Sequence, residues 1–178
     1  MNLQRESRQL VSNLSVGYKQ RLALASAIIA KPQVLFLDEP TSGVSPTSRR
    51  NFFDIIQNLS DQGTTVIVTT HFMDEAERCD TIAFLSAGKL LAFDNPDSLK
   101  KNSIKGILVE LHLPEPMGHI DKLTDLPYVS DCFIHGSLLH VLVADQEGLE
   151  NLKKEVNVPL KIIKPSLDDV FIALAKKR

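Results

Sequence analysis

The sequence contains few of the residues that cross-link or anchor a protein. Its 178 residues include two cysteines, Cys79 and Cys132, and no tryptophan. Disulfide frameworks belong to small secreted domains, whereas a chain of this length can bury a sizeable core without them. The first residues, MNLQRE, also lack the apolar core of a secretory signal. A reducing cytoplasm is therefore the location that the cysteine usage favours.

Long hydrophobic runs and an excess of one charge are also missing. The longest mostly apolar stretch, residues 22–30, is interrupted by Ser26 and is far shorter than the ~20 residues that span a bilayer. Residues 1–103 carry 11 basic and 11 acidic side chains, and residues 104–178 carry 9 and 11. Nucleic-acid binding requires a cationic surface. We therefore expect neither a membrane span nor a nucleic-acid partner.

Short β-rich runs alternate with helical stretches over the first hundred residues. This order is typical of an α/β fold, in which crossover helices connect the strands of a parallel sheet. A continuous apolar run predicts a central strand that is covered on both faces. The expected elements are a helix buried nearly all round at 22–30, that strand at 34–37, a helix from Ser45 and Pro46 to Gly63, a strand at 64–70, a short helix at 73–79 and a hairpin over 82–93.

A change of pattern indicates a domain boundary near residue 103. Residues 95–97 and 100–106 are polar and rich in helix breakers. The following order of strand, helix, strand, strand, helix and strand predicts a small ferredoxin-like α+β unit. Its expected elements lie at 107–113, 119–126, 128–134, 138–143, 146–156 and 160–163, before a closing helix at 166–177. The predicted domains are residues 1–103 and 104–178.

Polar side chains follow two of the expected strands. Asp38 and Glu39 come directly after the apolar run, and His71 ends the next strand. Parallel strands joined by one right-handed crossover have their carboxyl ends at the same edge, where open α/β sheets bind ligands. Adjacent carboxylates there suit Mg²⁺ and the activation of a water molecule. The alternatives are an acidic turn before a helix and a histidine that only begins a helix.

The segment Leu14–Tyr18 precedes the first expected helix. Ser15 is a suitable N-cap, and Gly17 permits close approach of another backbone. The free amide groups and the positive dipole of a helix start favour anions. Simple capping by Ser15 is the alternative interpretation.

Three stretches in this order resemble motifs of ATP-binding cassette (ABC) ATPases. LSVGYKQRL at 14–22 resembles the signature motif, VLFLDEPTSGVSP at 34–46 the Walker B strand with its D-loop, and TTHFMDEAE at 69–77 the switch-histidine loop. Residues 1–103 thus look like the C-terminal part of an ABC ATPase domain, with a partial P-loop-type parallel sheet. Residues 104–178 are similar to the C-terminal extension of drug and polysaccharide exporter cassettes, and PSLDDVF at 165–171 resembles its closing motif.

The resemblance implies an ATP-hydrolysing subunit of an ABC exporter, with ATP and Mg²⁺ as its cofactors. Asp38 is expected to hold Mg²⁺, Glu39 to polarise the attacking water and His71 to contact the γ-phosphate. The nucleotide of the opposing subunit is expected to contact the signature residues Ser15, Val16, Gly17 and Tyr18.

The implied partners are a second ATPase subunit, arranged head to tail, and a membrane-embedded permease. The expected location is therefore the cytoplasmic side of the plasma membrane, where the chain is held through the permease.

The sequence departs from the family pattern at several points. Val16 stands where a glycine is usual, Tyr18 replaces a common Gln or Met, and Ser45 replaces an Asp. No Gly-x4-Gly-Lys-Ser/Thr loop is present, because Gly88-Lys89 is followed by Leu90. We expect the chain alone to bind ATP weakly and to be inactive. The alternatives are a noncatalytic half-cassette that pairs with a complete ATPase, and a cassette protein that acts on ribosomes or DNA.

Overall fold

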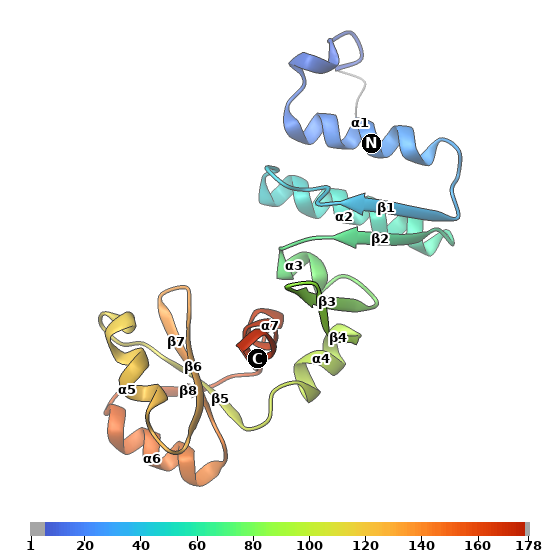
Figure 1. Cartoon of the computed structure of the whole chain (residues 1–178). Coiled ribbons are helices and arrows are strands. Elements are labelled where there is room, and N and C mark those ends of the chain that lie inside the picture. The colour runs from blue at the N-terminus through green and yellow to red at the C-terminus, as the bar shows by residue number, and fades with distance from the viewer. Residues whose placement is uncertain (1–5, 177–178) are drawn as a thin grey trace. The chain divides into compact units, whose positions relative to one another are not determined.

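The computed structural model describes residues 6–176 (Figure 1). The chain divides into two compact units between Arg78 and Cys79. Both units contain helices and strands, which confirms the prediction of a mixed α/β structure. Among the described residues, no helix combines the length and the apolar character that crossing a membrane requires. The first unit contains α1 (Val16–Ile28), β1 (Val34–Asp38), α2 (Pro46–Asp61), β2 (Thr65–Thr69) and α3 (Met73–Ala76).

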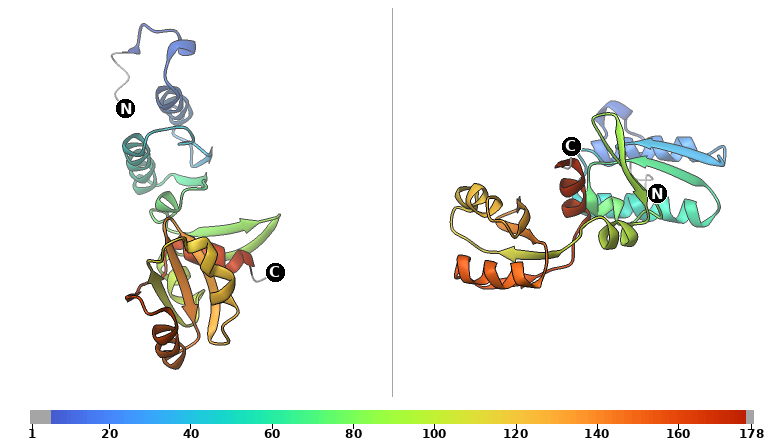
Figure 2. Two further views of the ribbon diagram at one scale, coloured as in Figure 1. Left: turned by 90° about the vertical axis from the view of Figure 1, so that its left-hand side faces the viewer. Right: turned by 60° about the horizontal axis from the view of Figure 1, so that its bottom comes forward.

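Strands β1 and β2 pair in parallel, and α2 connects them. The hydroxyl of Ser45 accepts a hydrogen bond from the backbone N–H of Ser48, and Pro46 takes the first helical position, as the sequence predicts. Helix α2 lies along the strand pair (Figure 2) and buries Phe52, Phe53 and Ile56. The strands and the helix between them thus have the predicted bounds to within one or two residues.

The predicted burial of this unit is wrong in two places. Alternate residues of β1 are exposed, with Phe36 at 72% exposure, and among the described strands β1 pairs only with β2. It is therefore neither central nor covered on both faces. Helix α1 buries only Leu24 instead of nearly its whole circumference. An apolar run shows that a surface suits burial, but burial also requires a neighbouring element to cover it.

The second unit begins with the predicted hairpin of β3 (Ile82–Ser86) and β4 (Lys89–Asp94). Helix α4 (Pro96–Asn102) follows in the polar stretch that the sequence indicates as breaker-rich. The side chain of Asn95 accepts the N–H of Ser98, so residues interpreted as breakers instead begin a helix. The compact units divide between Arg78 and Cys79, and the predicted domain boundary near residue 103 stays a prediction.

The rest of this unit has the predicted order of strands and helices. Its four strands are antiparallel in the order β6-β7-β5-β8. A 3₁₀ turn at Pro116–His119 precedes α5, and Lys177, the predicted end of the closing helix, lies outside the described residues. The elements are β5 (Ile107–Leu111), α5 (Ile120–Thr124), β6 (Val129–His135), β7 (Leu138–Val143), α6 (Gln146–Val156), β8 (Leu160–Ile162) and α7 (Leu167–Lys176).

The four-stranded sheet is covered on both faces by elements of its own unit. Helices α5 and α6 cover one face (Figure 1), and their apolar side chains form a core with alternate residues of the strands. On the other face α7 buries Asp169, Val170 and Ala173, and the Lys176 ammonium donates to Asp131 of β6. The members of the core are Val109, Leu111, Leu113, Leu123, Cys132, Leu139, Val141, Val143, Leu149 and Leu152.

Gly106, which precedes β5, provides a test of this packing. It has φ +116°, and an added Cβ would lie 2.3 Å from the carbonyl oxygen of Val143. We expect Gly106→Ala to lower the free energy of unfolding by roughly 2 kcal/mol or more. Gly118→Ala is the matched control, because nothing lies within 4 Å of that position. Urea unfolding followed by circular dichroism measures both variants, and equal midpoints would contradict the packing described.

The buried thiol of Cys132 provides a second test. Burial raises its pKa to about 11, Asp131 adds to the increase and Lys176 opposes it. The unreactive thiol form therefore dominates at neutral pH. In a Cys79→Ser variant, we expect iodoacetamide to alkylate Cys132 at pH 7.5 only after denaturation, as measured by mass spectrometry. Rapid alkylation of the folded protein would show that the thiol is accessible.

Candidate functional site

The carboxyl ends of β1 and β2 meet at one edge of the parallel pair. Asp38 is aligned with Thr69 in the last pair of the register. The Thr69 hydroxyl donates to the Asp38 carboxylate and accepts the backbone N–H of Glu39 at 3.0 Å. One threonine thus fixes the positions of both acidic residues relative to β2.

Glu39 and His71 come together at this edge. The Nδ1 atom of His71 lies 3.4 Å from Oε1 of Glu39, and the two side chains are 57% and 52% exposed. Glu39 has φ +41°, a conformation that is uncommon for residues other than glycine and that turns the chain sharply after β1. The structure therefore brings together the two residues that the shared sheet edge predicts to converge. Their catalytic roles stay predictions.

The buried carboxylate of Glu75 stabilises this edge of the parallel strand pair. Glu75 of α3 is 3% exposed, and it accepts hydrogen bonds from the hydroxyl groups of Thr41 and Thr70. These threonines follow β1 and β2 respectively, so Glu75 connects the two segments that carry Glu39 and His71. The Thr70 hydroxyl also accepts the backbone N–H of Phe72, which fixes the chain just beyond His71.

Sequence reasoning missed these supporting residues. The only signal was the presence of hydroxyl residues at both strand ends, at Thr41, Thr69 and Thr70. Such residues are common after strands and in turns, so they indicate no particular contact until the fold places them.

The start of α1 forms a separate part of the candidate site. Ser15 is at the N-cap position with extended backbone, but its side chain makes no capping hydrogen bond. The simple capping role considered for Ser15 is therefore not observed. Ser15 and Val16 are exposed, whereas Gly17 and Tyr18 are half-buried.

The same helix start packs against the segment after β1. The side-chain amide of Gln20 donates to the carbonyl oxygen of Ser42 at 3.0 Å, and a Cβ at Gly17 would lie 3.7 Å from Val44. Within residues 6–176, no hydrogen bond or ion pair joins residues 15–18 to Asp38, Glu39 or His71. The structure thus presents two exposed sets of polar groups in the first unit, one at the sheet edge and one at the helix start.

The sheet edge has the donor atoms that a hard cation requires. The Asp38 carboxylate is exposed and lies beside the hydroxyl of Thr69, so both available donors are oxygen atoms. Mg²⁺ prefers oxygen ligands and retains several of its water molecules. Asp38 therefore fits the metal role that the sequence suggests, while His71 does not provide a suitable ligand for that ion.

Comparison with known proteins yields one family model and a consistent group of relatives. Residues 7–72 match the model described as "AAA domain, putative AbiEii toxin, Type IV TA system". The Nod factor export ATP-binding protein I of Rhizobium etli is 37% identical over 166 residues, which cover 92% of this chain and 52% of the relative. The protein of the same name from Burkholderia lata is 34% identical over 97% of this chain and 57% of its own length.

A further relative matches a shorter part of the chain more closely. The "Probable multidrug ABC transporter ATP-binding protein YbhF" of Escherichia coli K12 is 56% identical over 90 residues, which cover 51% of this chain and 16% of the relative. The chain spans about half the length of the Nod factor export proteins that it matches. These relationships identify the chain as a homologue of the ATP-binding proteins of ABC transporters.

Proposed function

We propose that the chain forms part of the ATP-hydrolysing subunit of an ABC exporter. The observation that carries this proposal is the meeting of Glu39 and His71, 3.4 Å apart, at the sheet edge where Asp38 ends β1. The names of the relatives support the transporter class, since they are export and multidrug ATP-binding proteins. The transported substrate would be selected by the permease.

The three residues at the edge have complementary roles in phosphoryl transfer. Asp38 would hold Mg²⁺, and the ion would supply positive charge beside the phosphate oxygens of ATP. Glu39 accepts a hydrogen bond from the attacking water and orients it, while the His71 ring contacts the γ-phosphate. Because phosphoryl transfer depends mainly on position and electrostatics, the Thr69 and Glu75 contacts that fix this edge are part of the mechanism.

The start of α1 serves the nucleotide of a second subunit in this proposal. Ser15 is exposed and makes no capping bond with its side chain, so its hydroxyl and the first amides of the helix can face an anion. Gly17 allows close approach, whereas the β-branched Val16 restricts the backbone and weakens the contact. Two subunits arranged head to tail would each complete the other's site.

Hydrolysis also requires a phosphate-binding loop, and the 178 residues contain no Gly-x4-Gly-Lys-Ser/Thr sequence. We therefore propose that the chain alone binds ATP weakly and does not turn it over. A region with that loop, on the same or another polypeptide, supplies the remaining phosphate contacts.

The proposed domains are an ATPase part at 1–103 and an exporter-type extension at 104–178. The strand order β6-β7-β5-β8 supports a ferredoxin-like extension. Along the chain, α5 connects β5 to β6 and α6 connects β7 to β8, as that fold requires. We place the assembled protein at the cytoplasmic face of the plasma membrane, bound to a permease.

One observation favours the alternative of a noncatalytic module that pairs with a complete ATPase. Phe36 of β1 and Ile67 of β2 expose apolar side chains on the parallel pair, at 72% and 48% exposure. A surface of this kind suits association with another cassette region. The two proposals differ in whether the chain contributes Glu39 to turnover.

Glu39→Gln tests the catalytic proposal in a chimera that joins this chain to the remaining, loop-bearing half of a Nod factor export relative. Removing the charge that orients water should lower kcat by roughly 100-fold or more while ATP binding is kept. Glu147→Gln, an exposed position on α6, is the control. A phosphate-release assay measures turnover. Wild-type turnover in the Glu39→Gln chimera would support the noncatalytic module.

His71→Ala tests the second member of the pair in the same chimera. Loss of a ring that contacts the γ-phosphate should lower kcat by about 100-fold. His112→Ala removes an exposed histidine after β5 and should leave turnover unchanged. Full activity in both the His71→Ala and the His112→Ala chimera would show that His71 has no catalytic role and only begins the segment before α3.

A further inference from the structure

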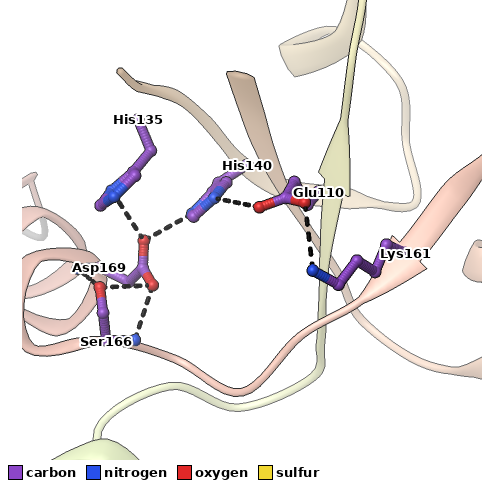
Figure 3. Close-up of polar contacts among 6 residues, drawn as sticks. All are labelled: Glu110, His135, His140, Lys161, Ser166 and Asp169. Carbon is purple, nitrogen blue, oxygen red and sulfur yellow. Dashed lines mark hydrogen bonds and ion pairs between the residues drawn. The ribbon is translucent and has the colours of Figure 1, made fainter. Parts of the chain in front are cut away.

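Two histidines and an aspartate gather on the second face of the four-stranded sheet (Figure 3). His140 lies on β7, His135 ends β6 and Asp169 lies in the first turn of α7. One potential ligand atom from each of the three lies within 4.8 Å of the others. No step of the proposed ATP hydrolysis uses these residues.

A single carboxylate oxygen faces both rings. Asp169 Oδ1 lies 2.7 Å from Nδ1 of His140 and 3.9 Å from Nδ1 of His135. The two rings are stacked, with centroids 4.6 Å apart and planes inclined by 2°. His140 and Asp169 are almost wholly buried, whereas the His135 side chain is 42% exposed. The cluster therefore has a fixed inner side and one ligand that is open to solvent.

The other oxygen of Asp169 is already fixed. Oδ2 accepts the backbone N–H and the hydroxyl of Ser166, at 2.7 and 2.8 Å, and Ser166 Oγ in turn accepts the N–H of Asp169. This reciprocal arrangement caps the start of α7. It leaves Oδ1 directed at the histidines.

A second carboxylate lies behind His140. The Nε2 atom of His140 is buried without a hydrogen-bond partner and lies 3.8 Å from Oε2 of Glu110. The Glu110 carboxylate also pairs with Lys161, at 3.6 Å. Metal-binding histidines characteristically direct one ring nitrogen at the ion and the other toward a carboxylate or carbonyl group. His140 has this arrangement if the ion lies on its Nδ1 side.

We propose that His135, His140 and Asp169 bind a late first-row divalent cation, with Zn²⁺ as the expected ion. Two imidazoles and a carboxylate suit Zn²⁺, whereas Mg²⁺ and Ca²⁺ prefer oxygen ligands alone. Water occupies the fourth position of a tetrahedral site. The site is independent of the proposed ATPase, because it lies in the other compact unit.

Binding requires two small movements. The ion replaces the proton between His140 Nδ1 and Asp169 Oδ1, so these atoms separate from 2.7 Å to about 3.3 Å, the spacing of two ligands on tetrahedral zinc. The His135 ring leaves the stack to direct its nitrogen at the ion, and its exposure leaves room for that rotation. The bound ion then joins α7 to β6 and β7.

Calorimetric titration of the purified, EDTA-treated full chain with ZnCl₂ tests the site. We expect one Zn²⁺ per chain and a rise in thermal unfolding temperature on binding. His135→Ala should weaken binding by roughly tenfold or more, and Glu110→Gln should also weaken it because His140 is then less well oriented. His112→Ala is the control and should bind as the wild type does.

Several outcomes would overturn the proposal. These are a lack of stoichiometric binding at about 100 µM free Zn²⁺ (about 5.5 kcal/mol of affinity), unchanged binding by His135→Ala, or an equal loss of binding in His112→Ala. The first would leave the cluster as a hydrogen-bonded contact that holds α7 against the sheet. Should His135→Ala fail to fold, visible absorption of the Co²⁺-loaded wild type decides, since tetrahedral nitrogen and oxygen ligation gives intense bands that hexahydrated Co²⁺ lacks.

Discussion

The parallel pairing of β1 with β2 is the constraint on which the candidate ATPase site depends. Its register aligns Asp38 with Thr69, and the segments beyond the two strands then place Glu39 against His71. Two kinds of contact maintain this arrangement: the Thr69 hydroxyl joins the strand ends, and the buried Glu75 carboxylate joins the threonines beyond them. A one-residue shift of register would separate the pair and expose the opposite face of β2.

Local sequence signals predicted the strands and helices well, and contacts between distant segments were the main source of error. Ser45 and Pro46 begin α2 as expected, and β1 ends where Asp38 follows the apolar run. Apolar runs overestimated the burial of α1 and β1, because a run carries no information about which neighbours are present. Residues such as Asn95 and Pro96 occur both in loops that end a helix and at the start of a helix. Only the tertiary contacts of α4 decide between these two structures.

The proposed zinc site illustrates a second limit of prediction from sequence. His135, His140 and Asp169 come from three elements, and no spacing between them resembles a metal motif. The alternation of β6 and β7 places both histidines on the face away from α5 and α6, and the cap formed by Ser166 directs the carboxylate toward them. A residue such as Asp169 thus has a local role that the sequence indicates and a tertiary role that only the fold reveals.

The central claim is that Glu39 and His71 act as one catalytic unit. A double-mutant cycle measures this most directly, with kcat determined for the wild type, both single variants and the Glu39→Gln/His71→Ala double variant of the chimera. The account predicts strong non-additivity, in which the double variant is about as slow as the slower single variant. Losses that multiply fully would show that the two residues act independently and would contradict the account.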